Sequence, residues 1–230
     1  MNHEGALRLW KNVGKLSLHP QRKEIMKDKV LFIDPERVYV SNACLIDIGE
    51  GTIIAPDVFL LGRITIGKDC LIGPGQVLHN VVTEDRVQIG ARPNIQDSDL
   101  EEGSRVGRLA EVVRSNIGPA TSIQHFSYVG DAMIGSGVNI GAGVVIANYD
   151  GSIKCLARVR DDVFIGSNST LVSPVQIGQE SFIGAGAIIR KDVESNSVVV
   201  GVDRVLPLRE SHKDGKNWKV TRIEILEELI

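Results

Sequence analysis

Aromatic residues make up only 4% of this 230-residue chain, although hydrophobic residues as a whole make up 43%. A buried core must therefore be built from aliphatic side chains. Glycine, in contrast, occurs 24 times, which predicts many tight backbone corners. This composition favours a repetitive β architecture.

The chain also lacks long hydrophobic runs and a strong charge of one sign. No apolar stretch approaches the ~18 residues of a membrane-spanning helix, and the first residues, MNHEGALRLWKNVGK, have no signal-peptide hydrophobic region. The net charge is −3 and the 26 basic residues are scattered, which argues against a nucleic-acid or membrane surface. We therefore expect a cytoplasmic protein with neither kind of partner.

Cysteine is scarce as well. Cys44, Cys70 and Cys155 lie far apart and show no C-x-x-C spacing, which argues against a disulfide framework and against a zinc site. We expect reduced, mostly packed thiols.

What the sequence does contain is a period of six residues. Large side chains recur at Ile48, Ile54, Leu60, Ile66, Ile72 and Leu78, then at Tyr128, Ile134, Ile140 and Ile146, and finally at Ile165, Leu171, Ile177, Ile183 and Ile189. This period fits neither a helix nor a half-exposed strand, but it fits a short strand followed by a corner. Three such units make one triangular coil of about 18 residues, so the pattern predicts an all-β hexapeptide-repeat solenoid, a parallel β-helix.

Two breaks in the register divide the chain. The register blurs between Val82 and Arg108, and the spacing between Ile146 and Ile165 is 19, which predicts a loop insertion near residues 148–162. We expect a helical or irregular arm at 1–28, a β-helix domain at 29–205 and a tail at 206–230. The arm and the tail are capping segments that would cover the open ends of the solenoid.

Several polar residues near the second break are candidates for chemistry. Histidine ordinarily changes charge near neutral pH, so His125 is a candidate general base, although a packed histidine is an equally simple reading. Tyr128 and Asn139 are ambiguous in the same way. The sequence NYDG at 148–151, followed by Lys154, offers amide, phenol, carboxylate and amine groups, but part of it is ordinary turn chemistry.

Three stretches carry a resemblance to a known family: HFSYVGDAMIGSGVNIGAGVVIANYDG, DDVFIGSNSTLVSPVQIG and GAGAIIRKDV. From about Val30 onward the chain resembles the C-terminal acetyltransferase domain of the bacterial bifunctional N-acetylglucosamine-1-phosphate uridylyltransferase/glucosamine-1-phosphate N-acetyltransferase. The resemblance implies a left-handed β-helix, a homotrimer, acetyl-CoA as cosubstrate and a role in UDP-N-acetylglucosamine biosynthesis for the cell envelope. No Gly-rich nucleotide loop precedes the repeat, so we expect no uridylyltransferase activity, and we predict no metal.

The resemblance also implies roles for individual residues. His125 is the base that deprotonates the acceptor amine, with the glutamate Glu111 near it. Our own hypothesis adds that Glu111 orients the ring and that Asn148 or a nearby backbone N–H stabilises the oxyanion. Tyr128, Asn139 and Lys154 bind the sugar phosphate. The acetyl-CoA site falls on Ala142, Asn148, Tyr149, Ser167, Ala185 and Arg204.

Two positions depart from the family pattern. The family carries an arginine in an R-P-G segment, where Arg92 is out of register here, and a lysine at the position of Val113. Arg92, Arg108 or Arg114 could replace them as phosphate ligands, and we assign this role to Arg114. The departures leave two alternatives open: an acetyltransferase for another amino sugar or nucleotide-linked amine, and a catalytically inactive β-helix scaffold or partner protein.

Overall fold

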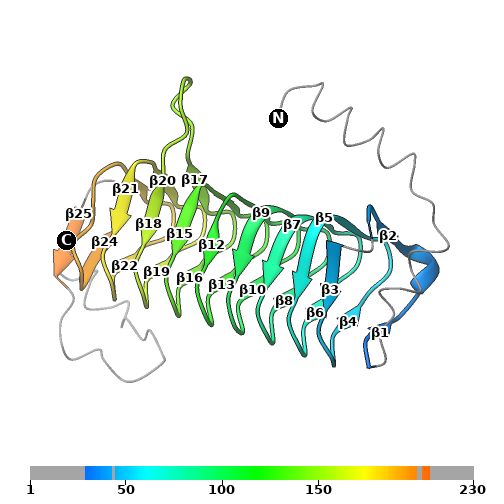
Figure 1. Cartoon of the computed structure of the whole chain (residues 1–230). Coiled ribbons are helices and arrows are strands. Elements are labelled where there is room, and N and C mark those ends of the chain that lie inside the picture. Colours follow the sequence, from blue (N-terminus) through cyan, green and yellow to red (C-terminus); the bar gives the residue numbers. More distant parts are fainter. Residues whose placement is uncertain (1–28, 43–44, 201–203, 208–230) are drawn as a thin grey trace.

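The computed structural model describes residues 29–42, 45–200 and 204–207. The predicted arm at 1–28, Cys44 and all but the first two residues of the predicted tail lie outside these residues. The described chain is all-β, and its parallel sheets form a solenoid of about nine turns, a left-handed β-helix (Figure 1). The predicted fold class is therefore confirmed.

The solenoid has three flat faces, which we call faces A, B and C in chain order. Face A is an 11-stranded sheet that ends in one antiparallel strand. Its strands are β1 (Leu31–Phe32), β4 (Ile53–Ile54), β6 (Leu71–Ile72), β8 (Gln88–Ile89), β10 (Arg105–Val106), β13 (Ser122–Ile123), β16 (Asn139–Ile140), β19 (Phe164–Ile165), β22 (Phe182–Ile183), β24 (Ser197–Val200) and β25 (Arg204–Pro207).

Faces B and C together form a 14-stranded sheet. Face B contains β2 (Val38–Val40), β11 (Glu111–Val113), β14 (Tyr128–Gly130), β17 (Val145–Ala147), β20 (Thr170–Val172) and β23 (Ile188–Ile189). Face C contains β3 (Ile46–Ile48), β12 (Asn116–Ile117), β15 (Ala132–Ile134), β18 (Ala157–Val159) and β21 (Val175–Ile177). Three long strands run from face B onto face C: β5 (Val58–Ile66), β7 (Val77–Thr83) and β9 (Asn94–Leu100). A short 3₁₀ helix, η1 (Pro35–Arg37), precedes β2.

The central coils are one residue shorter than the 18 that three hexads predict. Tyr128 pairs in register with Glu111 and with Val145, each 17 residues away. The missing residue lies between faces B and C, where the inward-facing Val129 and Ile134 are only five residues apart. This shortening explains why the six-residue register blurs after Val82.

The short coil also corrects the predicted place of Tyr128. The six-residue spacing groups Tyr128 with Ile134 and Ile140 and so predicts that its side chain faces the interior as theirs do. In the structure Val129 is the fully buried residue, and Tyr128 is half-buried on the outer surface of face B. Successive residues of a strand point to opposite sides, so a shift of one residue exchanges them. Tyr128 is therefore available for a site on the surface.

The corner between faces B and C, which we call the B/C corner, carries polar side chains in left-handed backbone conformation. Asn80, Asp97, Arg114 and Asp131 occupy it in four successive coils with φ between 48° and 52°. Asparagine and aspartate tolerate this conformation better than other non-glycine residues. Glycine, which the composition predicted for such corners, occupies the same corner at Gly62. The corner thus presents a column of polar side chains along the solenoid.

The chain leaves the solenoid after β17 in a hairpin that projects from its side (Figure 1). The Cys155 N–H donates to the Asn148 carbonyl at 2.7 Å and closes the hairpin. At its tip the Asp150 carboxylate accepts from the N–H groups of Ser152 and Ile153, both at 2.7 Å. Because β18 begins at Ala157, the excursion is shorter than the 148–162 loop expected from the sequence.

Candidate functional site

His125 lies at the corner between faces A and B, in a column that contains one residue from each successive coil. The backbone carbonyls of Arg108, His125, Ala142 and Ser167 accept hydrogen bonds from the N–H groups of the following coils, at 2.9 to 3.2 Å. We call the residues of this file the His125 column: Arg108, His125, Ala142, Ser167 and Ala185. Adjacent coils are about 4.8 Å apart, so Ala185 lies three coils, roughly 14 Å, from His125. The structure thus brings the predicted base into line with three of the predicted acetyl-CoA positions.

A strip of bare backbone runs beside this column. A Cβ atom at Gly141 would lie 2.6 Å from the Ser167 nitrogen and 2.8 Å from the Ile165 carbonyl oxygen. The coils can stack at their normal spacing here only because Gly141 has no side chain. The side chains of Ala142, Ser167 and Ala185 beside it are small, so no bulky side chain of the column covers this strip in the coils after His125.

The side chain of His125 is exposed rather than packed in the core. Its ring makes an edge contact with the ring of Phe126, with the centroids 5.5 Å apart and the planes at 86°. Glu111, the residue expected to orient His125, instead accepts a hydrogen bond from Asn94 Nδ2 at 3.1 Å. The orienting role of Glu111 stays a prediction.

A second group of polar side chains lies on face B and at the B/C corner. Arg114 donates to both carboxylate oxygens of Asp131, at 2.6 Å from Nε and 2.8 Å from Nη2. Asn148 Nδ2 donates to Asp131 Oδ2 and approaches the Tyr128 hydroxyl at 3.4 Å. A Cβ atom at Gly130 would lie 2.6 Å from the Tyr128 hydroxyl and 2.7 Å from Asn148 Nδ2. We call Arg114, Tyr128, Asp131 and Asn148 the polar cluster.

The ion pair sets the electrostatics of this cluster. Hydrogen bonds from Arg114 lower the pKa of Asp131 despite its partial burial, and Asn148 and Lys154 act in the same direction. The same pair raises the pKa of Arg114. Arg114, predicted to bind the acceptor, is thus already bound to a carboxylate. Sequence reasoning missed Asp131, and the only available signal was an aspartate next to a glycine before a strand.

The remaining predicted residues lie around these two groups. Asn139 is on face A, paired in register with Ser122 and Phe164. Tyr149 and Lys154 face each other across the hairpin in an isolated bridge, and the Tyr149 hydroxyl donates to the Gly151 carbonyl at 2.7 Å. Arg204 begins β25, where its side chain lies outside the described atoms.

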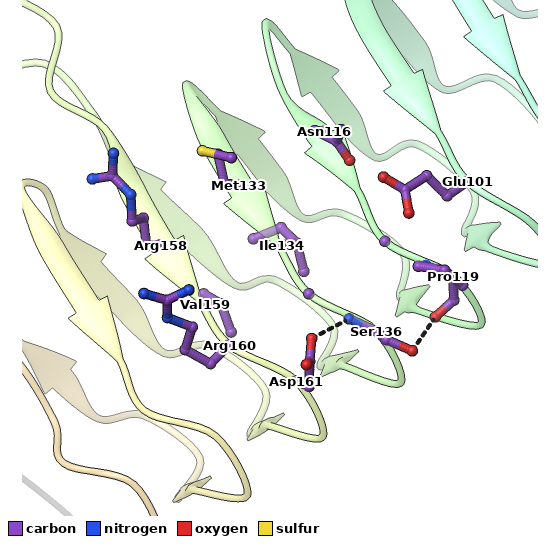
Figure 2. Close-up of a pocket in the computed structure, with 12 residues that line it drawn as sticks. Glu101, Asn116, Pro119, Met133, Ile134, Ser136, Arg158, Val159, Arg160 and Asp161 are labelled. Atoms are coloured by element: carbon purple, nitrogen blue, oxygen red, sulfur yellow. Dashed lines mark hydrogen bonds between the residues drawn. The ribbon is translucent and has the colours of Figure 1, made fainter.

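A separate groove lies on face C and its corner with face A. It has a volume of about 320 Å³ and is lined on one side by Arg158 and Arg160 and on the other by Glu101 (Figure 2). Ser136 spans its floor through hydrogen bonds to Asp161 and to the Pro119 carbonyl (Figure 2). None of the residues predicted for the site lines this groove. Within residues 29–42 and 45–200 we also find no cluster of histidine, cysteine and acidic side chains that could hold a metal ion.

The family model for the bacterial transferase hexapeptide (six repeats) matches residues 157–191. The bifunctional protein GlmU of Thermotoga petrophila is 38% identical over 196 residues, which are 78% of this chain and 44% of that protein. The GlmU protein of Rubrobacter xylanophilus is 39% identical over 193 residues, 76% of this chain and 41% of that protein. The resemblance to GlmU proteins is confirmed.

This similarity covers less than half the length of those GlmU proteins. Among solved structures, UDP-N-acetylglucosamine acyltransferase of Francisella novicida is 18% identical with a TM-score of 0.45, over 71% of this chain and 68% of that one. A hexapeptide-repeat acetyltransferase of Vibrio cholerae, in complex with acetyl coenzyme A, is 23% identical with a TM-score of 0.41, over 47% of this chain and 68% of that one. No helix in the described part of our chain is long and apolar enough to span a membrane.

Proposed function

We propose that this chain is an acetyl-CoA-dependent N-acetyltransferase that converts glucosamine-1-phosphate to N-acetylglucosamine-1-phosphate. The observation that carries the proposal is the His125 column, in which an exposed histidine is aligned with Ala142, Ser167 and Ala185. Each of these positions has a counterpart in the acetyltransferase domain that the sequence resembles. The proposal concerns this domain alone and includes no uridylyl transfer.

In the proposed reaction the acceptor amine attacks the carbonyl carbon of the thioester. His125 accepts the proton that the nitrogen loses, a new C–N bond forms, and the C–S bond breaks. The proton on His125 then passes to the departing sulfur, which leaves as the thiol of coenzyme A. General base catalysis of this kind typically contributes about 10² to 10⁴ in rate.

The group that would donate a hydrogen bond to the oxyanion is Asn148 or a backbone N–H, and the two differ in their distance from His125. Asn148 lies at the B/C corner and His125 at the other edge of face B, one coil earlier. Five residues, 143–147, separate Asn148 from Ala142, the member of the His125 column in its own coil, so the two side chains lie at opposite edges of the face. A backbone N–H near His125 is therefore a better oxyanion donor within one chain. Asn148 would reach the reacting atoms most readily in a site that is shared between chains.

We propose a homotrimer with shared sites, working in the cytoplasm on precursors of the cell envelope. Exposed apolar side chains support a covered surface here: Leu109 and Phe126, in successive coils beside the His125 column, are 50% and 63% exposed. Tyr149 and Ile153 on the projecting hairpin are 59% and 61% exposed. In a closed cyclic trimer the hairpin of one chain would cover the corner of the next.

The test is release of coenzyme A thiol from acetyl-CoA in the presence of a panel of amines. We expect turnover with glucosamine-1-phosphate and a loss of at least 100-fold in kcat for His125→Ala. His79→Ala, in β7 on face B, is the matched control and should keep wild-type turnover. Equal turnover in the His125 variant would refute the mechanism.

The other outcomes separate the remaining readings. Turnover only with a different amino sugar or nucleotide-linked amine would support the related acetyltransferase, and no turnover with any amine would support a scaffold. Light scattering of the purified chain tests the trimer, and a monomeric mass would contradict the shared site.

A further inference from the structure

The His125 column has two sides, and only one of them is assigned to the cosubstrate. Ala142, Ser167 and Ala185 all lie in coils that follow His125, so acetyl-CoA in the proposed site extends toward the C-terminal coils. The acceptor must approach the same histidine from a direction that the cosubstrate leaves open. Within the column, this direction is the coil that precedes His125.

Arg108 is the residue of the His125 column in that preceding coil. Its backbone carbonyl accepts a hydrogen bond from the Phe126 N–H at 3.2 Å, which fixes it one coil before His125. Its side chain is exposed, and among the residues that the structure describes it has no carboxylate partner. Its Cγ lies toward the preceding coil, 3.3 Å from where a Gly90 Cβ would be. An extended arginine side chain is longer than the coil spacing of about 4.8 Å, so rotation of this exposed side chain brings its guanidinium to a molecule bound beside His125.

The other candidate arginines are less well placed. Arg114 donates to both oxygens of Asp131 and would have to break this ion pair to bind an anion. Arg92 lies in the coil before that of Arg108, and therefore one coil further from His125. Arg114 is therefore already paired, and Arg92 is more distant from His125 than Arg108 is.

We propose that Arg108 binds the anionic group of the acceptor and determines the preference for a phosphorylated amino sugar. This inference rests on the proposed function. A guanidinium matches a phosphate through two parallel hydrogen bonds. Arg108 would thus replace the arginine and lysine that the resemblance leads one to expect near Arg92 and Val113.

The test compares two acceptors, glucosamine-1-phosphate and glucosamine, with wild type, Arg108→Ala and Arg108→Lys. For Arg108→Ala we expect KM for glucosamine-1-phosphate to rise 10- to 100-fold, the range of a charge-assisted hydrogen bond. The KM for acetyl-CoA and the kcat/KM for glucosamine should stay within twofold of wild type. Arg108→Lys should recover part of the loss because it keeps the charge.

Inorganic phosphate provides a second readout as a competitive inhibitor against glucosamine-1-phosphate. Its inhibition constant should rise in Arg108→Ala and stay unchanged in the matched control, Arg92→Ala. Thermal unfolding of each variant confirms that the fold is kept.

The possible failures can be told apart. A wild-type chain that acetylates no amine refutes the proposed function, and the role of Arg108 falls with it. An active wild type with unchanged discrimination in Arg108→Ala refutes the role of Arg108 and leaves the proposed function standing. Loss of discrimination in Arg114→Ala alone would transfer the role to Arg114 and overturn the inference.

Discussion

Replacement of Asp131 by asparagine tests the polar cluster most directly. The carboxylate accepts two hydrogen bonds from Arg114, at 2.6 and 2.8 Å, and a third from Asn148. The side chains of Arg114 and Asp131 are 35% and 17% exposed, so the pair is neither on the open surface nor in the core. Asp131→Asn keeps the shape, removes the charge and leaves Arg114 without its bidentate partner.

The size of the effect follows from this intermediate burial. Exposed ion pairs contribute about 0 to 1 kcal/mol, whereas breaking a fully buried pair costs about 3 to 5 kcal/mol. We therefore expect Asp131→Asn to lower the free energy of unfolding by about 2 kcal/mol at pH 7. Because the folded-state pKa of Asp131 is lowered, this stabilisation is complete above the ordinary carboxyl pKa of about 3.9 and is lost as pH falls through the folded-state value.

Urea unfolding followed by circular dichroism measures this difference. Asp97→Asn is the matched control, because Asp97 occupies the same corner with the same φ of 48° but accepts a side-chain hydrogen bond from Asn80 alone, at 2.9 Å. The control should change the free energy of unfolding by about 0.5 kcal/mol or less. Equal losses in the two variants, or a loss in Asp131→Asn that does not shrink below pH 4, would refute the role assigned to the ion pair.

Three further predictions concern the two edges of face B. Gly130→Ala should reduce kcat/KM for the acceptor with little loss of stability, because the new Cβ, 2.6 Å from the Tyr128 hydroxyl, displaces side-chain tips rather than backbone; steady-state kinetics and thermal unfolding measure the two effects. Gly141→Ala should lower the free energy of unfolding by about 1 to 3 kcal/mol, because the new Cβ meets the backbone of the next coil. Gly186→Ala is the comparison variant: its Cβ would lie in open space but its φ is 73°, so it measures backbone strain without the clash. Lys154→Ala should raise KM for glucosamine-1-phosphate in the thiol-release assay, and an unchanged KM would remove Lys154 from the acceptor site.

The sequence predicts the aliphatic files well because each inward residue is constrained twice. It must fill the prism, and it must stack on its counterpart in the next coil. Ile54, Leu60 and Ile72 are accordingly fully buried. The prediction fails at Tyr128 because successive inward-facing residues are five apart, instead of six, across the B/C corner. Counting in steps of six back from Ile134 therefore gives Tyr128 rather than Val129.

The sequence predicts the His125 column better than it predicts the polar cluster at the opposite edge of face B. His125, Ala142 and Ser167 come from the resemblance, and they form a single column because of the 17-residue coil between the first two and the hairpin insertion between the last two. The Arg114–Asp131 pair could not be predicted, because it depends on two corner residues in left-handed conformation that place their side chains on the same edge. From the sequence alone, Arg114 therefore looks like a phosphate ligand, because nothing in the sequence shows that a carboxylate already binds it.

The five-residue corner also explains why the polar cluster lies where it does. Val129 faces inward, so Tyr128 and Gly130 face outward, and the absence of a side chain on Gly130 leaves room for the Tyr128 hydroxyl. The short B/C corner recurs in each coil up to Asp131, and in the next coil the hairpin that starts at Asn148 takes its place. After the hairpin the coil has its full length again, because Thr170 pairs with Ile188, 18 residues further on. The column of polar corner residues therefore ends at Asn148, with no further short corner to continue it. The polar cluster thus lies where the column of B/C corner residues ends, beside the hairpin that carries Tyr149 and Lys154. The change in coil length therefore positions both the polar cluster and the hairpin.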